Sequence, residues 1–367
     1  MDMANTSIKL DDKFNIKKSN VLLNGTQGLV RLMLGQKLRD EKQGLNTAGF
    51  VTGYRGSPLG AVDFQMRRAS KELLASNIKF KEALNEDLAT TALWGAQQAE
   101  LRGEGLYDGV FGLWYGKGPG VDRSGDAMRH ANMAGSSVNG GVLMAMGDDH
   151  SGESSTVLHQ SDLAMIDAGM PILSPAGVQE ILDYGYYGFA LSRYSGLWVG
   201  LKTMKDTIEV TSVVDGDPFR MEFKNPETMS TSDNLNIRLV DTPADQEKRL
   251  LSDKKTAAED FARINRIDKV GLPKLNSKIG LVAAGKNWLD LIHALSLLGI
   301  DESEAKALGI TSYKIVQTWP IDRQSLLEWA DQLDLIIVIE EKRKIVETQI
   351  KDAIFSIASK TRVYGGH

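Results

Sequence analysis

Glu86 is one of the residues whose type and position could support acid–base chemistry in this sequence. Asn85 is a good N-cap, so the pattern predicts Glu86 in the first turn of a helix, where an acidic side chain ordinarily just complements the helix dipole. The helix would carry a stripe of small residues, Ala89, Ala92, Gly95, Ala96 and Ala99. Such a stripe lets a second helix approach closely, and a carboxyl group at the end of a closely packed helix loses its water. A glutamate in that setting is a candidate for exchanging a proton with a ligand.

Residues 53–60, with the sequence GYRGSPLG, form a second candidate site. Two glycines and a proline at a strand-to-helix turn let the backbone approach a ligand, and free N–H groups at a helix start bind anions. Arg55 could add a carboxylate clamp, and Ser57 is placed to cap the helix that follows. A plain capped turn, with Pro58 at the first helical position, explains the same residues without a ligand. Spacing alone leaves both interpretations open.

Two further polar segments follow apolar runs. Residues 115–122, YGKGPGVD, match the dinucleotide fingerprint only loosely, and we expect a flexible loop that carries Lys117 toward an anion. Residues 147–150, GDDH, are followed by Ser154, Ser155 and His159. The sequence has no H-E-x-x-H motif, no EF-hand loop and no second acidic cluster at ligand spacing. We therefore expect substrate contacts or helix caps from these serines, and no metal site.

Two other segments are predicted to carry no site. Residues 280–287, GLVAAGKN, nearly match a P-loop, but the last position is asparagine and the apolar interior is typical of a strand. Residues 340–343, EEKR, are expected to form a solvated helix start.

The candidate residues lie where short apolar runs end, and these runs alternate with helical segments. Predicted strands cover residues 48–54, 110–115, 141–146, 171–173 and 197–201, and predicted helices cover 59–74, 122–133 and 178–191. After residue 277 the pattern resumes, with strands at 279–283, 313–317 and 335–339 and helices at 288–298, 322–333 and 347–357. The alternation predicts an α/β fold with mostly parallel sheets, whose ligands bind beyond the carboxyl ends of the strands.

A change in amino-acid composition divides the chain into three parts. Residues 226–276 are polar and charged, with one helix predicted over 243–264, and are expected to be a linker or extension. We therefore expect a larger α/β domain over residues 1–225 and a smaller one over 277–367.

The composition excludes several classes of function. The 367 residues include 43 basic and 48 acidic residues, a net charge of −5, unlike the basic excess of nucleic-acid-binding proteins. Cysteine is absent, which removes disulfides, thiol nucleophiles and cysteine-ligated iron–sulfur clusters from this chain. The N-terminus has no apolar signal-peptide core, and no stretch approaches the ~18 apolar residues of a membrane span, so we expect a cytoplasmic protein.

Taken in order, these segments resemble a known family. GLVRLMLGQKLRDEKQGLNTAGFVTGYRGSPLGAVD, LNEDLATTALWGAQQAEL, GLWYGKGPGVDRSGDAMRHANMAG and AMGDDHSGESSTVLHQSD look like the N-terminal part of bacterial indolepyruvate ferredoxin oxidoreductases, which are thiamine-pyrophosphate-dependent 2-oxoacid:acceptor oxidoreductases. The resemblance covers residues 22–220, and IGLVAAGKNWLDLIHAL and VIEEKRKIVETQI resemble the following transketolase-C-like domain. It implies a pyrimidine-binding domain over 1–225 and a transketolase-C-like domain over 277–367.

The resemblance also implies roles for cofactor-binding residues. In the family, an acidic residue that begins a small-residue helix hydrogen-bonds N1′ of the cofactor's aminopyrimidine and helps to activate the thiazolium carbon. Glu86 matches that residue, as cofactor ligand and catalytic residue. Gly56, Ser57 and Pro58 match the turn beside the cofactor, and Ser57 is also expected near the substrate carboxylate.

Arg55, Lys117 and His150 are the other substrate-binding candidates. The family often has Lys-His-x-Gly where this chain has Lys-Gly-Pro-Gly at 117–120, so the lysine carries over and the histidine does not. Pyruvate-specific relatives have an arginine near the end of the third strand, where this chain offers Asp149 and His150.

The family's diphosphate motif, Gly-Asp-Gly with a later Asn, is represented here only by Asp215-Gly216-Asp217-Pro218. We therefore expect this chain to bind the pyrimidine half of thiamine pyrophosphate and no metal, with Mg²⁺ and [4Fe–4S] clusters on missing regions or partner subunits. The complete enzyme would decarboxylate a 2-oxoacid, pass electrons to ferredoxin and the acyl group to CoA, and contain a homodimer of this chain. The alternatives are another thiamine enzyme component, of transketolase or 2-oxoacid dehydrogenase type, and a non-catalytic α/β assembly protein.

Overall fold

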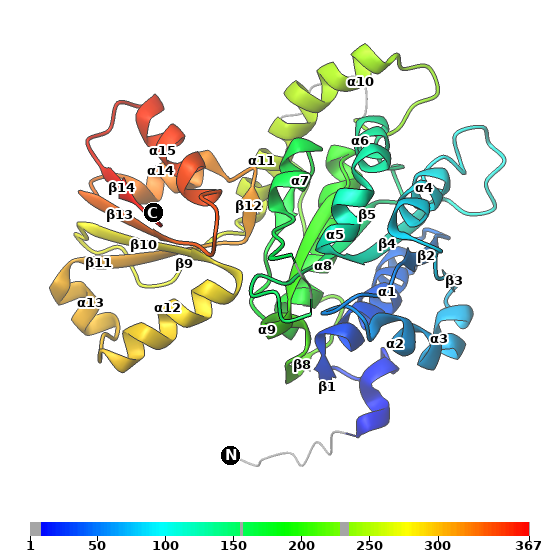
Figure 1. Cartoon of the computed structure of the whole chain (residues 1–367), viewed down its shortest axis with the longest axis horizontal. Coiled ribbons are helices and arrows are strands. Elements are labelled where there is room, and N and C mark those ends of the chain that lie inside the picture. The colour runs from blue at the N-terminus through cyan, green and yellow to red at the C-terminus, as the bar shows by residue number, and fades with distance from the viewer. Residues whose placement is uncertain (1–8, 155–156, 228–234, 367) are drawn as a thin grey trace.

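The computed structural model describes residues 9–154, 157–227 and 235–366. These residues form a seven-stranded, a five-stranded and a two-stranded sheet. In Figure 1 the seven-stranded sheet and its helices make up the right-hand body, and the five-stranded sheet lies in the left-hand body. None of the helices in these ranges has the length and apolar character needed to cross a bilayer.

The large sheet has the strand order β12-β6-β7-β5-β4-β2-β3. Its strands are β2 (Ala48–Gly53), β3 (Ile78–Phe80), β4 (Val110–Lys117), β5 (Val142–Asp148), β6 (Ile172–Leu173), β7 (Val199–Met204) and β12 (Gln317–Trp319). All neighbours pair in parallel except β6 and β12. The predicted α/β fold with a mostly parallel sheet is confirmed.

Helices cover both faces of this sheet. One face packs against α1 (Gly25–Lys42), α2 (Val62–Arg68), α3 (Ser70–Ala75) and α8 (Val178–Ser195), and the other against α4 (Glu86–Ala96), α5 (Gly118–Arg123), α6 (Gly125–Ala134) and α7 (Asp162–Asp167). Because successive side chains of a strand point to opposite faces, Leu113 and Tyr115 of β4 enter one core and Trp114 enters the other. The carboxyl ends of β2, β4 and β5 meet at one edge of the sheet.

The expected polar linker, residues 226–276, contains α10 (Pro243–Arg249), a π-helical turn η2 (Leu250–Lys254) and α11 (Lys255–Asn265). Phe261 of α11 is fully buried, 5.2 Å between ring centroids from Tyr187. Lys254 is also fully buried, and its Nζ donates a hydrogen bond of 3.3 Å to the Met133 carbonyl near the end of α6. These helices are therefore part of the large body's packing.

A short antiparallel sheet joins β1 (Asn20–Asn24) to β8 (Thr211–Asp215), with η1 (Leu10–Phe14) before it and α9 (Lys205–Ile208) preceding β8. The turn after β8 packs around Arg31, whose Nε and Nη2 donate to the Gly216 carbonyl at 3.3 and 3.1 Å. Arg31 also donates to the carbonyls of Lys13, Asn15 and Lys18. The Asp215-Gly216-Asp217 turn thus surrounds a buried guanidinium group.

The small sheet has the order β14-β13-β10-β11-β9, parallel except for β9. Its strands are β9 (Lys269–Val270), β10 (Ile279–Ala284), β11 (Ile310–Ile315), β13 (Leu335–Ile339) and β14 (Arg362–Tyr364), and its helices are α12 (Gly285–Leu297), α13 (Glu302–Leu308), α14 (Arg323–Ala330) and α15 (Val346–Ser356). The prediction of a strand rather than a P-loop near residue 280 is confirmed by β10.

The single strand predicted over 313–317 is wrong, because the chain changes sheets within it. β11 ends at Ile315 in the small sheet, and β12 begins at Gln317 in the large one. The Asp268 carboxylate accepts hydrogen bonds from the N–H groups of Val316 (2.7 Å) and Gln317 (3.3 Å). A single residue therefore separates the two sheets at this crossing.

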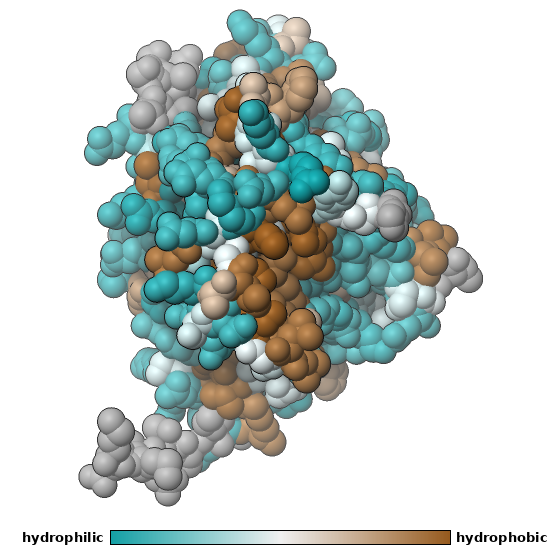
Figure 2. All heavy atoms as spheres, turned by 90° about the vertical axis from the view of Figure 1, so that its left-hand side faces the viewer, coloured by the Kyte–Doolittle hydropathy of each residue, from teal (hydrophilic) through white to brown (hydrophobic). Residues whose placement is uncertain are grey.

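The small-sheet body also exposes apolar surface. Figure 2, which views the molecule from this side, shows an apolar strip that crosses a largely hydrophilic face. The exposed large apolar side chains of α12, β13 and β14 include Leu289, Ile292, Ile337 and Tyr364. This body thus carries apolar surface outside its two cores.

Candidate active site

α4 begins at Glu86, as the sequence predicts. The Asn85 side chain accepts a hydrogen bond from the Leu88 N–H (2.8 Å) and so caps the helix. The Glu86 carbonyl accepts hydrogen bonds from Trp114 Nε1 (3.1 Å) and Thr90 Oγ1 (3.0 Å). Because Trp114 is fully buried in β4, these bonds fix the start of α4 against the sheet. The Glu86 residue itself is half-buried.

The Glu86 carboxyl group lies against Gly120 of α5. A Cβ atom at Gly120 would overlap Cγ and Oε1 of Glu86, and one at Gly118 would overlap the His159 ring. The two glycines therefore let the start of α5 touch both side chains. The flexible loop predicted over 115–122 is wrong, because β4 continues to Lys117 and α5 begins at the next residue.

The turn between β2 and α2 lies across the ends of β4 and β5. An added Cβ at Gly56 would lie 2.9 Å from Lys117 Cβ, so the backbone here touches the end of β4. Pro58 and Leu59 are buried and pack against Gly147 of β5.

The prediction that Ser57 caps the next helix is wrong. α2 begins at Val62, and its N-cap residue, Ala61, makes no side-chain capping hydrogen bond. Pro58 is accordingly not at the first helical position. The side chains of Arg55 and Ser57 are exposed, so both are available to a ligand.

Lys117 contacts the segment that follows β5. Its Nζ donates hydrogen bonds to the carbonyl (2.8 Å) and Oγ (3.1 Å) of Ser154 and lies 3.9 Å from Asp149 Oδ2. Burial raises the pKa of Asp149, but hydrogen bonds from Ser154 and Glu153 outweigh it and hold this pKa below its usual value. Ser154 thus bonds Lys117 and Asp149 and directly precedes no helix of the described residues, so the cap predicted for it is wrong. Ser155 lies outside the described residues.

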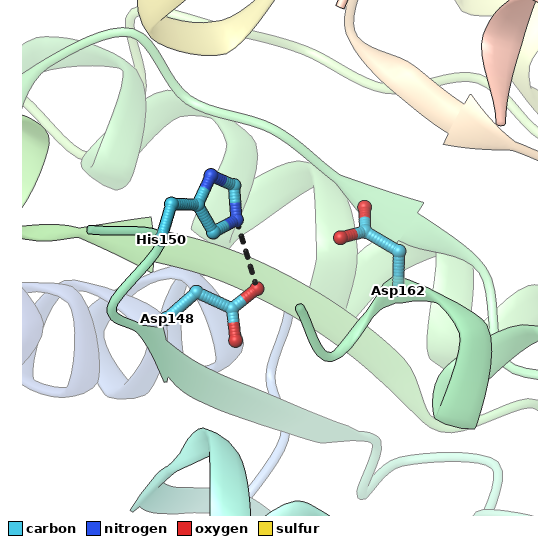
Figure 3. A group of neighbouring side chains, drawn as sticks. All are labelled: Asp148, His150 and Asp162. Carbon is cyan, nitrogen blue, oxygen red and sulfur yellow. Dashed lines mark ion pairs between the residues drawn. The ribbon is translucent and has the colours of Figure 1, made fainter. Parts of the chain in front are cut away.

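A cluster of charged side chains surrounds Asp148, the last residue of β5 (Figure 3). Asp148 is buried and accepts hydrogen bonds from the N–H and hydroxyl of Ser161. His150 Nε2 and His159 Nδ1 each lie 3.6 Å from its carboxylate. Burial raises the pKa of Asp148, but the two imidazoles and Lys202 outweigh this and hold the pKa well below its usual range.

The cluster connects the two bodies of the molecule. His150 Nδ1 lies 3.1 Å from Glu341 Oε2, and Lys342 Nζ donates to the Leu158 carbonyl at 2.9 Å. Glu340 accepts hydrogen bonds from the N–H groups at the start of α15. The solvated helix start expected at 340–343 is therefore wrong for the two glutamates, which are half-buried.

Sequence reasoning missed Asp162, Lys202 and Glu341. Asp162 begins α7, and Lys202 Nζ donates to its Oδ2 at 2.8 Å. Lys202 lies within the apolar strand β7, which is an unusual place for a lysine and was a readable signal. Glu341 gave no such signal, since only the fold brings it beside His150.

A cavity of about 600 Å³ lies beside α4, and its lining includes Phe50, Leu84, Leu88, Ala92 and Ala96. The small residues of the α4 stripe lie on two different sides of the helix. Ala89 is buried toward the sheet, whereas Ala92, Gly95 and Ala99 are exposed. The exposed side of α4 is thus apolar and adjoins an open groove.

Comparisons with known proteins agree with the resemblance drawn from the motifs. Residues 269–367 match the family model of the indolepyruvate oxidoreductase domain. The chain is 25% identical over 364 residues to indolepyruvate oxidoreductase subunit IorA of Pyrococcus horikoshii. The alignment covers 98% of this chain and 51% of that subunit. The Methanothermobacter marburgensis IorA subunit is 24% identical over 310 residues, covering 82% and 45%. The chain spans about half the length of the curated relatives it matches.

Solved structures show the same fold. The 2-oxoglutarate:ferredoxin oxidoreductase of Magnetococcus marinus matches with a TM-score of 0.68 and 14% identity, over 95% of this chain and 62% of that one. A split-gene transketolase, described as an inactive beta4 tetramer, matches with a TM-score of 0.55 and 12% identity, over 92% and 87%. The expected likeness to the domains of thiamine enzymes is confirmed at the level of fold.

Proposed function

We propose that this chain supplies the aminopyrimidine-binding half of the active site in a thiamine-pyrophosphate-dependent oxidoreductase of 2-oxoacids, with aryl pyruvates such as indolepyruvate as substrates. The observation that carries the proposal is the position of the Glu86 carboxyl group, between the start of α4 and Gly120 at the carboxyl edge of a parallel sheet. The similarity of the chain to IorA subunits of indolepyruvate oxidoreductases supports aryl pyruvates as the substrate class.

The residues around Glu86 fit the pyrimidine end of this cofactor. Glycines at 56, 118 and 120 let the backbone lie directly against the side chains of Lys117, His159 and Glu86, where a Cβ atom would clash. Glu86 would hold a proton at N1′ of the aminopyrimidine ring. When bound, thiamine pyrophosphate supplies a carbon nucleophile that adds to the 2-oxo group and accepts the electron pair left by CO₂. Gly56, Ser57 and Pro58 would flank the cofactor.

The substrate carboxylate would bind the exposed side chains of Arg55 and Ser57, with Lys117 beside them at the end of β4. His150 lies further along the same edge, where it contacts Glu341, so its contact with substrate is the least direct of the set. Residues 1–225 would form the pyrimidine-binding domain, 226–276 the connecting helices, and 277–367 the transketolase-C-like domain.

The other half of the site would come from other regions or partner subunits. In the Asp215-Gly216-Asp217 turn the Gly216 carbonyl accepts hydrogen bonds from Arg31, and we do not assign the diphosphate to this turn. We assign the diphosphate, its Mg²⁺, the [4Fe–4S] clusters and the ferredoxin and CoA sites to those partners. A second copy of this chain would pack on the exposed apolar side of α4.

Calorimetric titration tests the half-site directly. The 367-residue chain alone should bind thiamine pyrophosphate weakly and without dependence on Mg²⁺. A few net hydrogen bonds of about 1 kcal/mol each barely offset an association cost of at least ~4 kcal/mol. Micromolar, Mg²⁺-dependent binding would show that the chain holds a diphosphate site, and the half-site proposal would be abandoned.

The activity is tested on the complete enzyme with a panel of 2-oxoacids and a viologen acceptor. Aryl pyruvates should reduce the viologen fastest, and only when CoA is present. Transfer of a ketol group between sugar phosphates would instead identify a transketolase-type component. Absence of both activities from an enzyme shown to bind the cofactor would favour a non-catalytic assembly role.

A further inference from the structure

The Asp148, His150 and Asp162 side chains converge, although twelve positions of the sequence separate the second and third of these residues. Each offers a ligand-type atom, and these atoms lie within 4.8 Å of one another. Both carboxyl-bearing residues are buried, and the His150 side chain is 10% exposed. Figure 3 shows the imidazole and the two carboxylates facing the same space, between the end of β5 and the start of α7.

The orientation of His150 is fixed from its other side. Nδ1 lies 3.1 Å from Glu341 Oε2, a distance at which the ring donates its N–H to the carboxylate. The Nε2 lone pair then points into the cluster. Nε2 is buried and has no hydrogen-bond partner among the described residues, since Asp148 Oδ2 is 3.6 Å away. A carboxylate–histidine pair with the second nitrogen free is the usual arrangement behind a metal-bound histidine.

The charges of the cluster leave room for a divalent cation. Asp148, Asp162 and Glu341 are negative, and the Lys202 ammonium is the cation bonded directly to Asp162. Three carboxylates thus converge on the buried ammonium of Lys202. Lys202 bonds Oδ2 of Asp162, so Oδ1 is the oxygen not bonded to this ammonium. Asp148 keeps Ser161 as its hydrogen-bond donor.

We propose that Asp148, His150 and Asp162 bind a divalent first-row transition metal ion, with Zn²⁺ as the representative. One imidazole and two carboxylates suit such an ion better than Mg²⁺, which prefers oxygen ligands alone. Water would complete the coordination from the adjoining cavity of about 290 Å³, which Asp148, His150 and Glu341 line. The site would tie the segment after β5 to the small-sheet body through Glu341.

This site is independent of thiamine pyrophosphate, so its test needs neither cofactor nor activity. The untagged 367-residue chain is stripped with a chelator and titrated with ZnSO₄ by calorimetry, and separately with MgCl₂. We expect one Zn²⁺ per chain and much weaker Mg²⁺ binding. Loading with Co²⁺ should give visible absorption bands of an N/O-coordinated ion.

Variants separate ligands from bystanders. Glu341→Gln should weaken Zn²⁺ binding about 10–100-fold because it frees the ring of His150, and His150→Gln or Asp162→Asn should weaken it more. His293→Gln removes an exposed histidine of α12 and should leave the affinity unchanged. Circular dichroism reports the folding of each variant, and Zn²⁺ should raise the melting temperature of the parent chain but not of His150→Gln.

Three results would overturn the proposal. These are no stoichiometric Zn²⁺ binding by the stripped chain, affinity that is unaltered in folded His150→Gln and Asp162→Asn, or Mg²⁺ binding as tight as Zn²⁺ binding. The third would indicate a site made of oxygen ligands alone, and the first two would mean that Lys202 and protons on His150 and His159 balance the carboxylates. In that arrangement burial lowers the pKa of His150, and Asp148 and Glu341 raise it to a net value above the ordinary one.

Discussion

The Glu86 side chain lies directly against Gly120, where an added Cβ atom would overlap both Cγ and Oε1 of Glu86. Gly120 is helical and buried in α5, so its own backbone would accept alanine. An added methyl group would displace the Glu86 side chain from Cγ outward. The position of the Glu86 carboxyl group therefore depends on the absence of a side chain at Gly120 in α5.

Gly120→Ala should consequently separate stability from turnover. The melting temperature should change little, because the cost of moving the Glu86 side chain is offset by the roughly 1 kcal/mol by which alanine favours a helix over glycine. Turnover of the complete enzyme should fall by roughly 10²-fold, the scale of a displaced catalytic group. Gly177→Ala is the matched control, since a Cβ there has no neighbour within 4 Å. Equal turnover in both variants would contradict the role of this contact.

Glu86→Gln in the complete enzyme should preserve the fold and lower kcat by about 10²–10⁴-fold, the range of general acid–base contributions. Glutamine can form a neutral hydrogen bond, but it does not share a proton with N1′ as a carboxyl does. Asp87→Asn changes the neighbouring acid of the same helical turn and should have little effect. Parental kcat in Glu86→Gln would remove this residue from the mechanism.

Gly95→Leu should disrupt self-association of the chain. A Cβ at Gly95 meets nothing within 4 Å in one copy, so the substitution costs little within the monomer. If α4 packs against a second copy, the larger side chain overpacks that contact by typically 1–3 kcal/mol. Sedimentation velocity should show a dimer for the parent and a shift toward monomer for the variant. Monomers in both samples would end the idea of an α4 interface.

Lys254→Met should alter the pH dependence of stability. Burial, with Arg249 and Arg238 nearby, lowers the pKa of Lys254 to about 7. Because this folded-state pKa lies below the unfolded value of about 10.4, stability from neutral Lys254 is present at high pH and is lost as the pH falls toward 7.

The variant should therefore gain most over the parent near pH 7, with the gain shrinking toward pH 10. Urea unfolding at both pH values measures the difference in free energy of unfolding. The exposed neighbour Lys255→Met is the control and should show no such trend. A gain that does not change with pH would contradict the lowered pKa.

The parts predicted well from the sequence depend on neighbouring residues. Asn85 caps a helix through the Leu88 N–H three residues away, so the place of Glu86 follows from local chemistry. Parallel strands with polar ends likewise predict which edge of the sheet carries the candidates. The predicted Ser57 cap is wrong because three residues, 59–61, follow Pro58 before α2 begins.

Other features depend on long-range packing that no local pattern encodes. His150 and Glu341 are 191 positions apart, and only the docking of the small-sheet body places them together. The charge cluster around Asp148 was therefore not foreseen as a set. The change of sheet at Val316 could not be predicted either, because Val316 and the residue before it are both apolar. The residue that holds the chain there, Asp268, accepts a hydrogen bond from the Val316 N–H and lies 48 positions away.

The crossing at Val316 has a mechanical consequence. The backbone leaves one sheet and enters the other within a single residue, and Gln317 and Trp319 then pair with β6 at the edge of the large sheet. A rotation of the small-sheet body would pull on β12 and break its pairing with β6. A displacement of the small-sheet body would therefore act directly on β12, the edge strand of the sheet that carries Lys117 and Asp148.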